Sequence, residues 1–258
     1  MSEGEGPVLV GVADGVGTIS LNRPHRHNAI DDDTHDRLVE AWDQVLTDPT
    51  VRVVLLRGEG KSFCSGRDTA QLGERLAGES DLSFVRRHQV IRETQLTSPK
   101  PVIAAVRGAT IGGGLEMALA ADIRIAASDV NMAFPEIRFG LMPDTGGTPL
   151  TTMLAGPSRA KWLAMSGRSI DATRALAWGL VDEVVEPEEL DKVAADFAAE
   201  LAEKSPEALS MIKSAVDGMW EAAVRTALRA ELLSQVALFA GEDYQARKRA
   251  RLEAKRNA

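Results

Sequence analysis

The sequence predicts a layered α/β protein, and three observations support this fold class. Between residues 8 and 127, short apolar runs of strand character alternate with segments of helical periodicity. The chain has 258 residues, of which 44% are hydrophobic and 26% charged, so it can bury a large core. From about residue 187 the strand signals end and long helical stretches rich in Ala, Glu, Leu and Lys follow. We expect these late helices to form an interface with a neighbouring subunit.

Each predicted element has its own local signal. Ala13-Asp14-Gly15 separates two β-type runs and predicts a hairpin. Leu38, Trp42 and Val45 recur at helical spacing after a run of capping aspartates. Ser98-Pro99-Lys100-Pro101 ends the next helix, and the apolar run after it is typical of a buried strand. The predicted strands are 8–12, 16–21, 51–57, 102–106 and 123–127, and the predicted helices are 31–48, 82–96, 112–121, 188–204, 206–216 and 220–240.

The charge balance limits the classes of partner. A formal net charge of −8 disfavours a general nucleic-acid binder. Basic residues nevertheless gather near the C-terminus, where they could meet a phosphate or, as is usual for charge runs, be solvated: Arg247, Lys248, Arg249, Arg251, Lys255 and Arg256. We therefore expect no nucleic-acid partner.

The sequence also predicts a compartment and the absence of a metal. The single cysteine, Cys64, cannot form an internal disulfide, which favours a reducing environment. The first six residues lack the features of a signal peptide, and no apolar run approaches a membrane span. The histidines lack metal-ligand spacing with acids or cysteine. We expect a cytoplasmic protein without a membrane partner or a metal.

The chemistry-bearing residues gather around a glycine turn. Gly112-Gly113-Gly114 follows an apolar strand and leads into a helix, so its bare N–H groups could face a closely docked group. Glu116 falls in the first turn of that helix, where it could move protons or simply favour the helix dipole. A second acid, Glu136, follows after Phe134-Pro135. The two glutamates are a candidate acid/base pair, although each alone could be an ordinary helix-start or loop acid.

A second loop could serve the same site. Phe63-Cys64-Ser65-Gly66-Arg67-Asp68 follows the predicted strand 51–57. Ligands of open α/β sheets gather beyond the carboxyl ends of strands, so the two loops could each offer an N–H to one oxygen. Such a pair forms an oxyanion hole, in which one donor contributes about 3 kcal/mol of transition-state stabilisation. By itself, a glycine triplet is more often a tight turn that lets a helix pack.

Taken together, these motifs resemble the enoyl-CoA hydratase/isomerase family, also called crotonases. The motifs occur in family order, and the likeness extends from about residue 7 to the final helix: Asn22-Arg23-Pro24 with Asn28-Ala29, Phe63 to Asp68, Lys100 to Val106, Gly112 to Glu116, and Pro135-Glu136 with Gly140-Leu141 and Gly146-Gly147. The resemblance implies an α/β spiral of ββα repeats with two nearly perpendicular sheets. It also implies C-terminal helices that build trimers, usually paired into hexamers, and an acyl-CoA thioester substrate.

The resemblance assigns roles position by position. The backbone N–H groups of Arg67 and Gly113 match the oxyanion-hole donors that hold the thioester oxygen. Glu116 matches the glutamate that chiefly activates water, and Glu136 matches the one that delivers a proton. Arg26, Arg67, Asp68 and Gly113 lie where family members bind the CoA substrate. No cofactor is implied beyond the CoA of the substrate itself.

Asp144 departs from the pattern of the well-studied hydratases, which tend to have glycine there. Some double-bond isomerases of the family have a catalytic aspartate at this position, and an isomerase only moves a proton between two carbons. Asp144 is also a good helix-capping residue before Thr145-Gly146-Gly147. Three carboxyls in one pocket would repel one another and leave at least one protonated. Which one, the sequence leaves open.

The sequence therefore predicts an enoyl-CoA hydratase of fatty-acid β-oxidation that uses Glu116 with Glu136. The enzyme alternative is an enoyl-CoA or dienoyl-CoA isomerase that uses Asp144 with Glu136, and a non-catalytic acyl-CoA binder is a third hypothesis. We divide the chain into a spiral core with the acyl-CoA site at 1–190 and a helical oligomerisation region at 191–258. In that last region Arg251 replaces a family aromatic that contacts a neighbour's CoA, and Lys255 fits the accompanying lysine only roughly.

Overall fold

A six-stranded sheet forms the centre of the computed structural model, which describes residues 6–256, with side chains described as far as residue 254. The sheet has the order β1-β2-β3-β4-β6-β9, and only the β1–β2 pair is antiparallel. A second sheet has the order β5-β7-β8. The strands are β1 Val8–Ala13, β2 Val16–Leu21, β3 Val53–Gly58, β4 Val102–Val106, β5 Ala109–Ile111, β6 Ile123–Ala127, β7 Asn131–Ala133, β8 Ile170–Asp171 and β9 Glu183–Val185.

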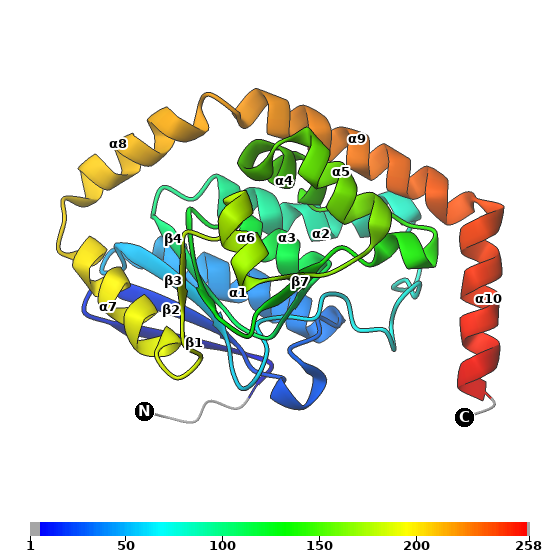
Figure 1. Cartoon of the computed structure of the whole chain (residues 1–258), viewed down its shortest axis with the longest axis horizontal. Coiled ribbons are helices and arrows are strands. Elements are labelled where there is room, and N and C mark those ends of the chain that lie inside the picture. Colours follow the sequence, from blue (N-terminus) through cyan, green and yellow to red (C-terminus); the bar gives the residue numbers. More distant parts are fainter. Residues whose placement is uncertain (1–5, 257–258) are drawn as a thin grey trace.

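Helices connect and cover these strands (Figure 1). Two short 3₁₀ helices, η1 Pro24–Arg26 and η2 Glu136–Phe139, lie in loops. The α-helices are α1 Asp32–Thr47, α2 Asp81–Leu96, α3 Gly113–Leu119, α4 Gly147–Ala155, α5 Pro157–Ser166, α6 Ala172–Trp178, α7 Leu190–Ala202, α8 Pro206–Asp217, α9 Glu221–Ala240 and α10 Glu242–Arg256.

The main sheet is buried on both faces, which explains its uninterrupted apolar strands. Along β3, Val54 and Leu56 face the larger cluster, which also contains residues of α1 and α3. Val53 and Leu55, which alternate with them, face a second cluster with α7. This helix begins at the boundary predicted between the core and the C-terminal region, and its buried residues pack against the core sheet.

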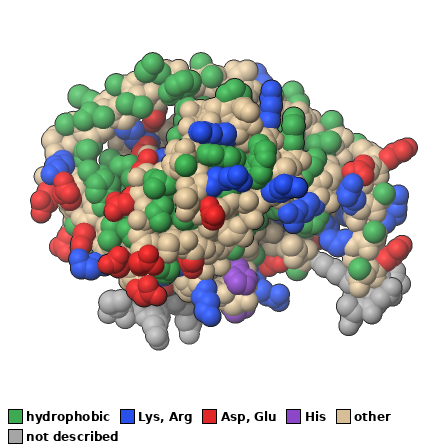
Figure 2. Space-filling view, viewed as in Figure 1, with side chains coloured by type: hydrophobic (Ala, Val, Ile, Leu, Met, Phe, Trp, Pro, Cys, Tyr) green, Lys and Arg blue, Asp and Glu red, His purple; other side chains and the backbone are tan. Residues whose placement is uncertain are grey.

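Of the last three helices, α8 lies apart from the core, whereas α9 packs against α2 and α4. In Figure 1, α8 and α9 run as an arch across one edge of the molecule, and α10 turns away at the end of α9. No residue of α8 is buried, and its Met211 and Ile212 are 72% and 62% exposed. Hydrophobic side chains follow this arch in the space-filling view (Figure 2). Nowhere in residues 6–256 does a helix combine the length and the apolar character that crossing a bilayer requires.

The long predicted elements are confirmed with small shifts of their ends. Strand β3 begins at Val53 rather than at residue 51, and α3 ends at Leu119 rather than near residue 121. The predicted helices 206–216 and 220–240 correspond to α8 and α9. The second sheet agrees with the two sheets that the resemblance implies, but the sequence patterns located none of its strands, nor β9, the helices α4 to α6, or α10. Strands of two or three residues are too short to show a period, so they leave no pattern to detect.

Candidate active site

The two loops predicted to share a site are in direct contact. The Cys64 N–H donates to the Ala109 carbonyl over 3.0 Å, and the Ile111 N–H donates to the Cys64 carbonyl over 2.9 Å. The first turn of α3 packs closely against the same loop. A Cβ atom on Gly114 would lie 2.2 Å from the Cys64 carbonyl oxygen, so a side chain there would push the loops apart.

The backbone N–H groups of Arg67 and Gly113 remain available for a ligand. Ile30 forms hydrogen bonds with the residues on both sides of Arg67: its carbonyl accepts from the Asp68 N–H, and its N–H donates to the Gly66 carbonyl. The Arg67 N–H therefore points away from Ile30. Gly113 is the first residue of α3, where no intrahelical acceptor exists. Within the described part of the chain, neither N–H donates a hydrogen bond. Both residues line one cavity, as the oxyanion-hole prediction requires.

This cavity has a volume of about 340 Å³ and lies between α2, α3, η2 and α9. Its size is typical of a site for a small organic group. It brings together the three predicted catalytic acids Glu116, Glu136 and Asp144. We call these acids, together with Glu231 of α9 behind them, the acidic wall.

Glu116 is fixed by three neutral donors. The N–H groups of Thr145 and Gly147 donate to its Oε1 over 2.8 and 2.9 Å, and the Thr145 hydroxyl donates to Oε2 over 2.6 Å. The side chain is 2% exposed, and no cation forms an ion pair with it in the described chain. Helix α3 presents this carboxyl to the segment that begins α4, so its position depends on both elements.

Glu136 occupies the opposite side of the glycine turn. A Cβ atom on Gly112, where φ is +55°, would lie 2.6 Å from Glu136 Oε1, so only glycine admits this carboxyl. Its Oε2 is buried without a hydrogen-bond partner in the described chain. Burial, together with the charges of Glu116 and Asp144, raises the pKa of Glu136 well above its usual value. The raised pKa favours the protonated form of Glu136, the form that can donate a proton.

Asp144 and Glu231 complete the acidic wall. Burial and the charge of Glu116 raise the pKa of Asp144 to about 8, against a hydrogen bond from Gln235 and the charge of Arg75. Burial and the same Glu116 charge raise the pKa of Glu231 to about 8. Glu231 accepts from the N–H groups of Gly146 and Thr148 over 2.7 and 2.9 Å. It thereby caps the N-terminus of α4, the role that the sequence analysis considered for Asp144.

The sequence analysis missed Glu231 and Gln235, although their spacing is informative. The buried residues of α9 are Leu228, Glu231, Gln235 and Phe239, which follow one another at intervals of three and four. Two polar residues on the buried stripe of a helix need polar partners, so they point to a site beneath that helix. The sequence analysis predicts only an oligomerisation role for this helix.

Arg67 and Arg75 also line the cavity, whereas Arg87 of α2 is not part of its lining. These three arginines have carboxylate partners: Asp32 Oδ1 lies 2.9 Å from both Arg67 and Arg87, and Arg75 lies 2.9 Å from Asp81. The Arg75 guanidinium also stacks 3.8 Å from the centre of the Phe84 ring. We call Arg67, Arg75 and Arg87, with their acids, the paired wall.

His88 is a neutral member of the cavity lining. Burial lowers the pKa of His88 to about 3, so its ring carries no charge at neutral pH. Its Nδ1 lies 2.8 Å from the Phe84 carbonyl, and its ring lies 4.7 Å from that of His35. No group of three or more histidine, cysteine or acidic side chains in the described residues is arranged to hold a metal ion.

Two predicted substrate-binding residues do not line the cavity. Asp68 is 7% exposed and binds Arg23 at 3.1 Å, so its carboxylate is already engaged. Burial opposes its ionisation, but the Ala70 N–H and Arg23 lower the pKa of Asp68 overall. Arg26 is exposed in η1, and its carbonyl accepts a 3.4 Å bond from the Ser65 hydroxyl beside the cavity. Arg26 is therefore near the loop that bears Arg67 but outside the cavity that Glu116, Glu136 and Asp144 line.

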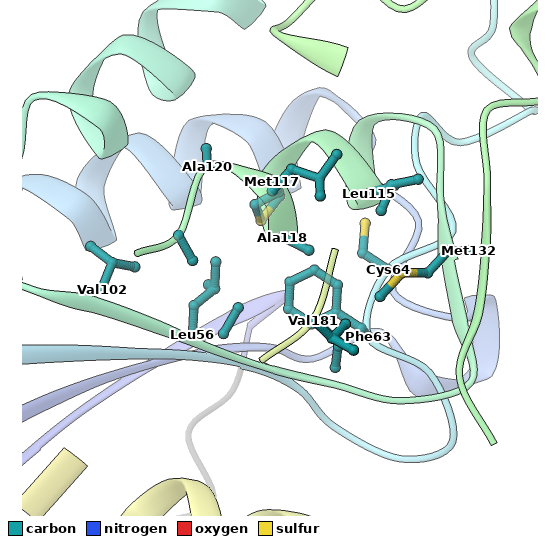
Figure 3. Packing of buried hydrophobic residues seen from close by; sticks show 14 of the residues in the cluster. Leu56, Phe63, Cys64, Val102, Leu115, Met117, Ala118, Ala120, Met132 and Val181 are labelled. Carbon is teal, nitrogen blue, oxygen red and sulfur yellow. The ribbon is translucent and has the colours of Figure 1, made fainter. Parts of the chain in front are cut away.

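Cys64 is a packing residue. Figure 3 shows its side chain beside Leu115 and Met132 in the apolar cluster. It is completely buried, and this burial raises the pKa of its thiol to about 12. The thiolate that a nucleophile requires is thus absent at neutral pH.

Several of the basic residues near the C-terminus bind the chain itself. Lys248 donates to the Gly73 carbonyl over 2.9 Å, Arg251 donates to the Leu72 carbonyl, and Arg247 pairs with Asp243. Leu72 and Gly73 line the cavity, so α10 holds part of its rim. The side chain of Lys255 lies outside the described residues.

Comparisons with known proteins agree with this geometry. A 1,2-epoxyphenylacetyl-CoA isomerase of Escherichia coli is 37% identical over 213 residues, which are 81% of each chain. A short-chain-enoyl-CoA hydratase of Clostridium acetobutylicum is 35% identical over 88% of this chain and 87% of that one. The crystal structure of an enoyl-CoA hydratase/isomerase from Xanthobacter autotrophicus Py2 superposes with a TM-score of 0.88 at 31% identity, covering 98% of this chain and 95% of that one. The family model for enoyl-CoA hydratase/isomerase matches residues 11–257, and the chain belongs to that family.

Proposed function

We propose that the protein is an enoyl-CoA hydratase that adds water to a trans-2-enoyl-CoA and forms a 3-hydroxyacyl-CoA. The observation that carries this proposal is the pairing of a carboxyl held by three donors, Glu116, with a buried carboxyl whose pKa is raised, Glu136. The two face one cavity beside two available backbone N–H groups. Hydration needs one proton acceptor and one proton donor, and the site contains both.

In the proposed reaction, a water molecule binds between the two glutamates. Glu116 accepts a proton from this water while its oxygen attacks Cβ of the enoyl thioester. The electron pair of the double bond moves toward the thioester oxygen, where the N–H groups of Arg67 and Gly113 stabilise the developing enolate. Glu136 then gives its proton to Cα, and the product leaves Glu116 protonated and Glu136 ionised. A proton exchange between the two carboxyls resets the enzyme.

A second candidate is a double-bond isomerase that uses Asp144 with Glu136. Asp144 lines the same cavity, and its pKa of about 8 lets it accept or donate a proton near neutral pH. A relative that is 37% identical to this chain is named 1,2-epoxyphenylacetyl-CoA isomerase, so its named substrate is an epoxide rather than an enoyl-CoA. In this alternative, water is not a reactant and the proton acceptor differs.

One experiment separates the two. Loss of the conjugated enoyl-thioester absorbance is followed with crotonyl-CoA for the wild type and for Glu116→Gln, Glu136→Gln and Asp144→Asn. We expect the wild type to hydrate crotonyl-CoA, either glutamine variant to lose activity by about a thousandfold, and Asp144→Asn to retain most of it. Absence of hydration, with isomerisation of a 3-enoyl- or dienoyl-CoA only when Asp144 is intact, would establish the isomerase instead.

Finer features extend the proposal. We propose that α8 and α9, whose exposed apolar side chains include Met211 and Ile212, form the contacts of a trimer or hexamer. Arg26 is proposed to bind a phosphate of CoA near the cavity mouth, and no further cofactor takes part. A cytoplasmic role in fatty-acid β-oxidation fits the substrate class.

A further inference from the structure

Two buried glutamates, Glu116 of α3 and Glu231 of α9, divide one short segment of backbone between them. Four successive N–H groups donate alternately to the two carboxyls, over 2.7 to 2.9 Å: Thr145 and Gly147 to Glu116, and Gly146 and Thr148 to Glu231. The threonine hydroxyls at the two ends of this 145–148 segment complete the pattern, and each donates over 2.6 Å to the carboxyl that its own N–H binds. The segment is therefore held from two sides, by α3 and by α9.

The two central glycines allow this alternation. Gly146 has a φ of +107°, a backbone conformation that favours glycine. A Cβ atom on Gly147 would lie 2.9 Å from Glu116 Oε1 and 2.5 Å from the Pro143 side chain, so a larger residue there would displace the carboxyl. The path of the segment and the position of the Glu116 carboxyl are thus fitted closely to each other.

A third side chain, Gln89 of α2, holds the same segment. It is 1% exposed, and its Nε2 donates to the Asp144 carbonyl over 2.7 Å and to the Leu228 carbonyl of α9 over 2.8 Å. The Asp144 carbonyl belongs to the peptide that carries the Thr145 N–H, which donates to Glu116. Gln89 therefore links the peptide that binds Glu116 to α9.

We propose that Glu231 is a positioning residue for the catalytic site: by holding the 145–148 segment against α9, it fixes the direction from which two N–H groups and one hydroxyl bind Glu116. Glu231 is 1% exposed and is not part of the cavity lining, so it acts without touching the substrate. The proposal rests on the proposed function, because it concerns the orientation of the carboxyl that accepts a proton from water in that reaction.

The contacts of Glu116 explain why its orientation depends on this segment. In the described chain, the three hydrogen bonds to its carboxyl all come from residues 145–148, and it forms no ion pair. A proton acceptor must lie within hydrogen-bond reach of the water that it activates. A displacement of about 1 Å can lower a rate by about a hundredfold. Any movement of the segment would therefore be passed to the proposed proton acceptor.

The first test compares Glu231→Gln and Glu231→Leu with the wild type in the hydration of crotonyl-CoA. Leucine removes every acceptor contact, whereas glutamine preserves the shape and keeps one oxygen for Thr148. We expect kcat to fall by about thirtyfold for Glu231→Leu and about fivefold for Glu231→Gln, with KM within about twofold of the wild type in both. A rise in KM with unchanged kcat would overturn the proposal.

Asp122→Asn is the matched control. Asp122 Oδ2 also accepts a backbone N–H, that of Val102, over 2.7 Å, but Asp122 neither lines the cavity nor bonds to the 145–148 segment. This variant should lose stability and keep kcat within about twofold of the wild type. A loss of kcat as large as that of Glu231→Leu would show that any weakened carboxyl contact lowers activity, and the proposal would be wrong.

A double-mutant cycle shows whether Glu231 acts through Glu116. In the Glu116→Gln background the carboxylate that the segment positions is already gone, so adding Glu231→Leu should lower kcat by less than about threefold. A loss of about thirtyfold in both backgrounds would indicate a general structural effect and would refute the positioning role.

The last measurement needs no turnover. Hydrogen exchange of single backbone N–H groups is followed by mass spectrometry in the ligand-free wild type and in the two Glu231 variants. If Glu231 secured only its own donors, Gly146 and Thr148 alone would exchange faster. We expect the N–H groups of Thr145 and Gly147, which bind Glu116, to exchange about tenfold faster as well.

The two proposals fail in different ways. Unchanged exchange at Thr145 and Gly147 in a folded variant would overturn the role of Glu231, and Glu231→Gln provides this comparison even where Glu231→Leu does not fold. A wild type that hydrates no enoyl-CoA would overturn the proposed function instead, and the exchange measurement would still decide whether Glu231 positions the donors of Glu116.

Discussion

On the paired wall, one carboxylate, Asp32, lies 2.9 Å from two arginines, whereas on the acidic wall Glu116, Glu136 and Asp144 share a buried space and form no ion pair with any described side chain. Burial alone would raise the pKa of Asp32, but Arg87 and Arg67 outweigh it and lower that pKa overall. Burial and mutual repulsion raise the pKa of Glu136 and Asp144. The comparison shows that a buried carboxyl without a cation partner has a raised pKa, which suits it to donate a proton.

The sharpest test of this contrast exchanges one glutamate on each wall. Glu136→Gln removes the proton donor and is expected to lower kcat for hydration by about a thousandfold. Glu79 is the matched control, because its side chain is only 8% exposed and pairs with Arg87 at 2.9 Å. Glu79→Gln should leave kcat within about threefold of the wild type while lowering stability. Steady-state kinetics and urea unfolding measure both, and equal losses of kcat in the two variants would refute the contrast.

A smaller effect is expected from breaking the pairing itself. Asp32→Asn leaves Arg67 and Arg87 without their shared carboxylate and should lower the free energy of unfolding by about 2 kcal/mol at pH 7. Because the folded-state pKa of Asp32 is lowered from 3.8, its stabilisation is present above that pH and is lost as pH falls through the folded value. Urea unfolding should therefore show a smaller difference between variant and wild type at pH 3 than at pH 7. A difference that grows on acidification would contradict the assignment.

The acidic wall should show the opposite dependence on pH. The folded-state pKa of Glu231 is raised from 4.5 to about 8, so its contribution to stability is full below pH 4.5 and declines as pH rises through about 8. Glu231→Gln keeps the shape but removes the titration. The fall in unfolding free energy between pH 5 and pH 8 should be less steep in the variant, by about 1 kcal/mol or more. Parallel pH profiles of the two proteins would show that Glu231 does not titrate in this range.

The smallest expected effect concerns Asp68. Its ion pair with Arg23 resembles those of the paired wall, so we expect it to serve stability rather than substrate binding. Asp68→Asn should change KM for crotonyl-CoA by less than about twofold and lower the free energy of unfolding by about 1 kcal/mol. A large rise in KM with unchanged stability would instead restore the substrate-binding role that the sequence predicted.

The features that the sequence could predict are those whose signal lies in residues close together along the chain. Apolar periodicity located α1, because an amphipathic face leaves a local record, and a composition rich in Ala, Glu and Leu located α9. Motifs located Glu116, Glu136 and Asp144, and the structure brings all three to one cavity. These successes share one property, which is that the signal lies within a short stretch of chain.

The remaining features depend on contacts between distant segments. Glu231 meets Gly146 across 85 positions, and Arg92 meets Gly113 across 21. Asp68 follows the loop motif closely enough to predict a substrate contact, yet Arg23, which is 45 positions away, engages its carboxylate. A residue's partners decide whether its charge is neutralised, and those partners are fixed only by the folded chain.

Because Glu231 caps α4 from a late helix, the site is completed only late in the synthesis of the chain. A ribosome makes the chain from its N-terminus, so Glu116, Glu136 and Asp144 all emerge before α9 does. Until Glu231 follows, the N–H groups of Gly146 and Thr148 lack the acceptor that holds them, and these groups flank the Gly147 N–H that binds Glu116. A nascent chain that ends after α7 therefore carries every proposed catalytic carboxyl but lacks the cap on the segment that holds Glu116, which arrives only with α9.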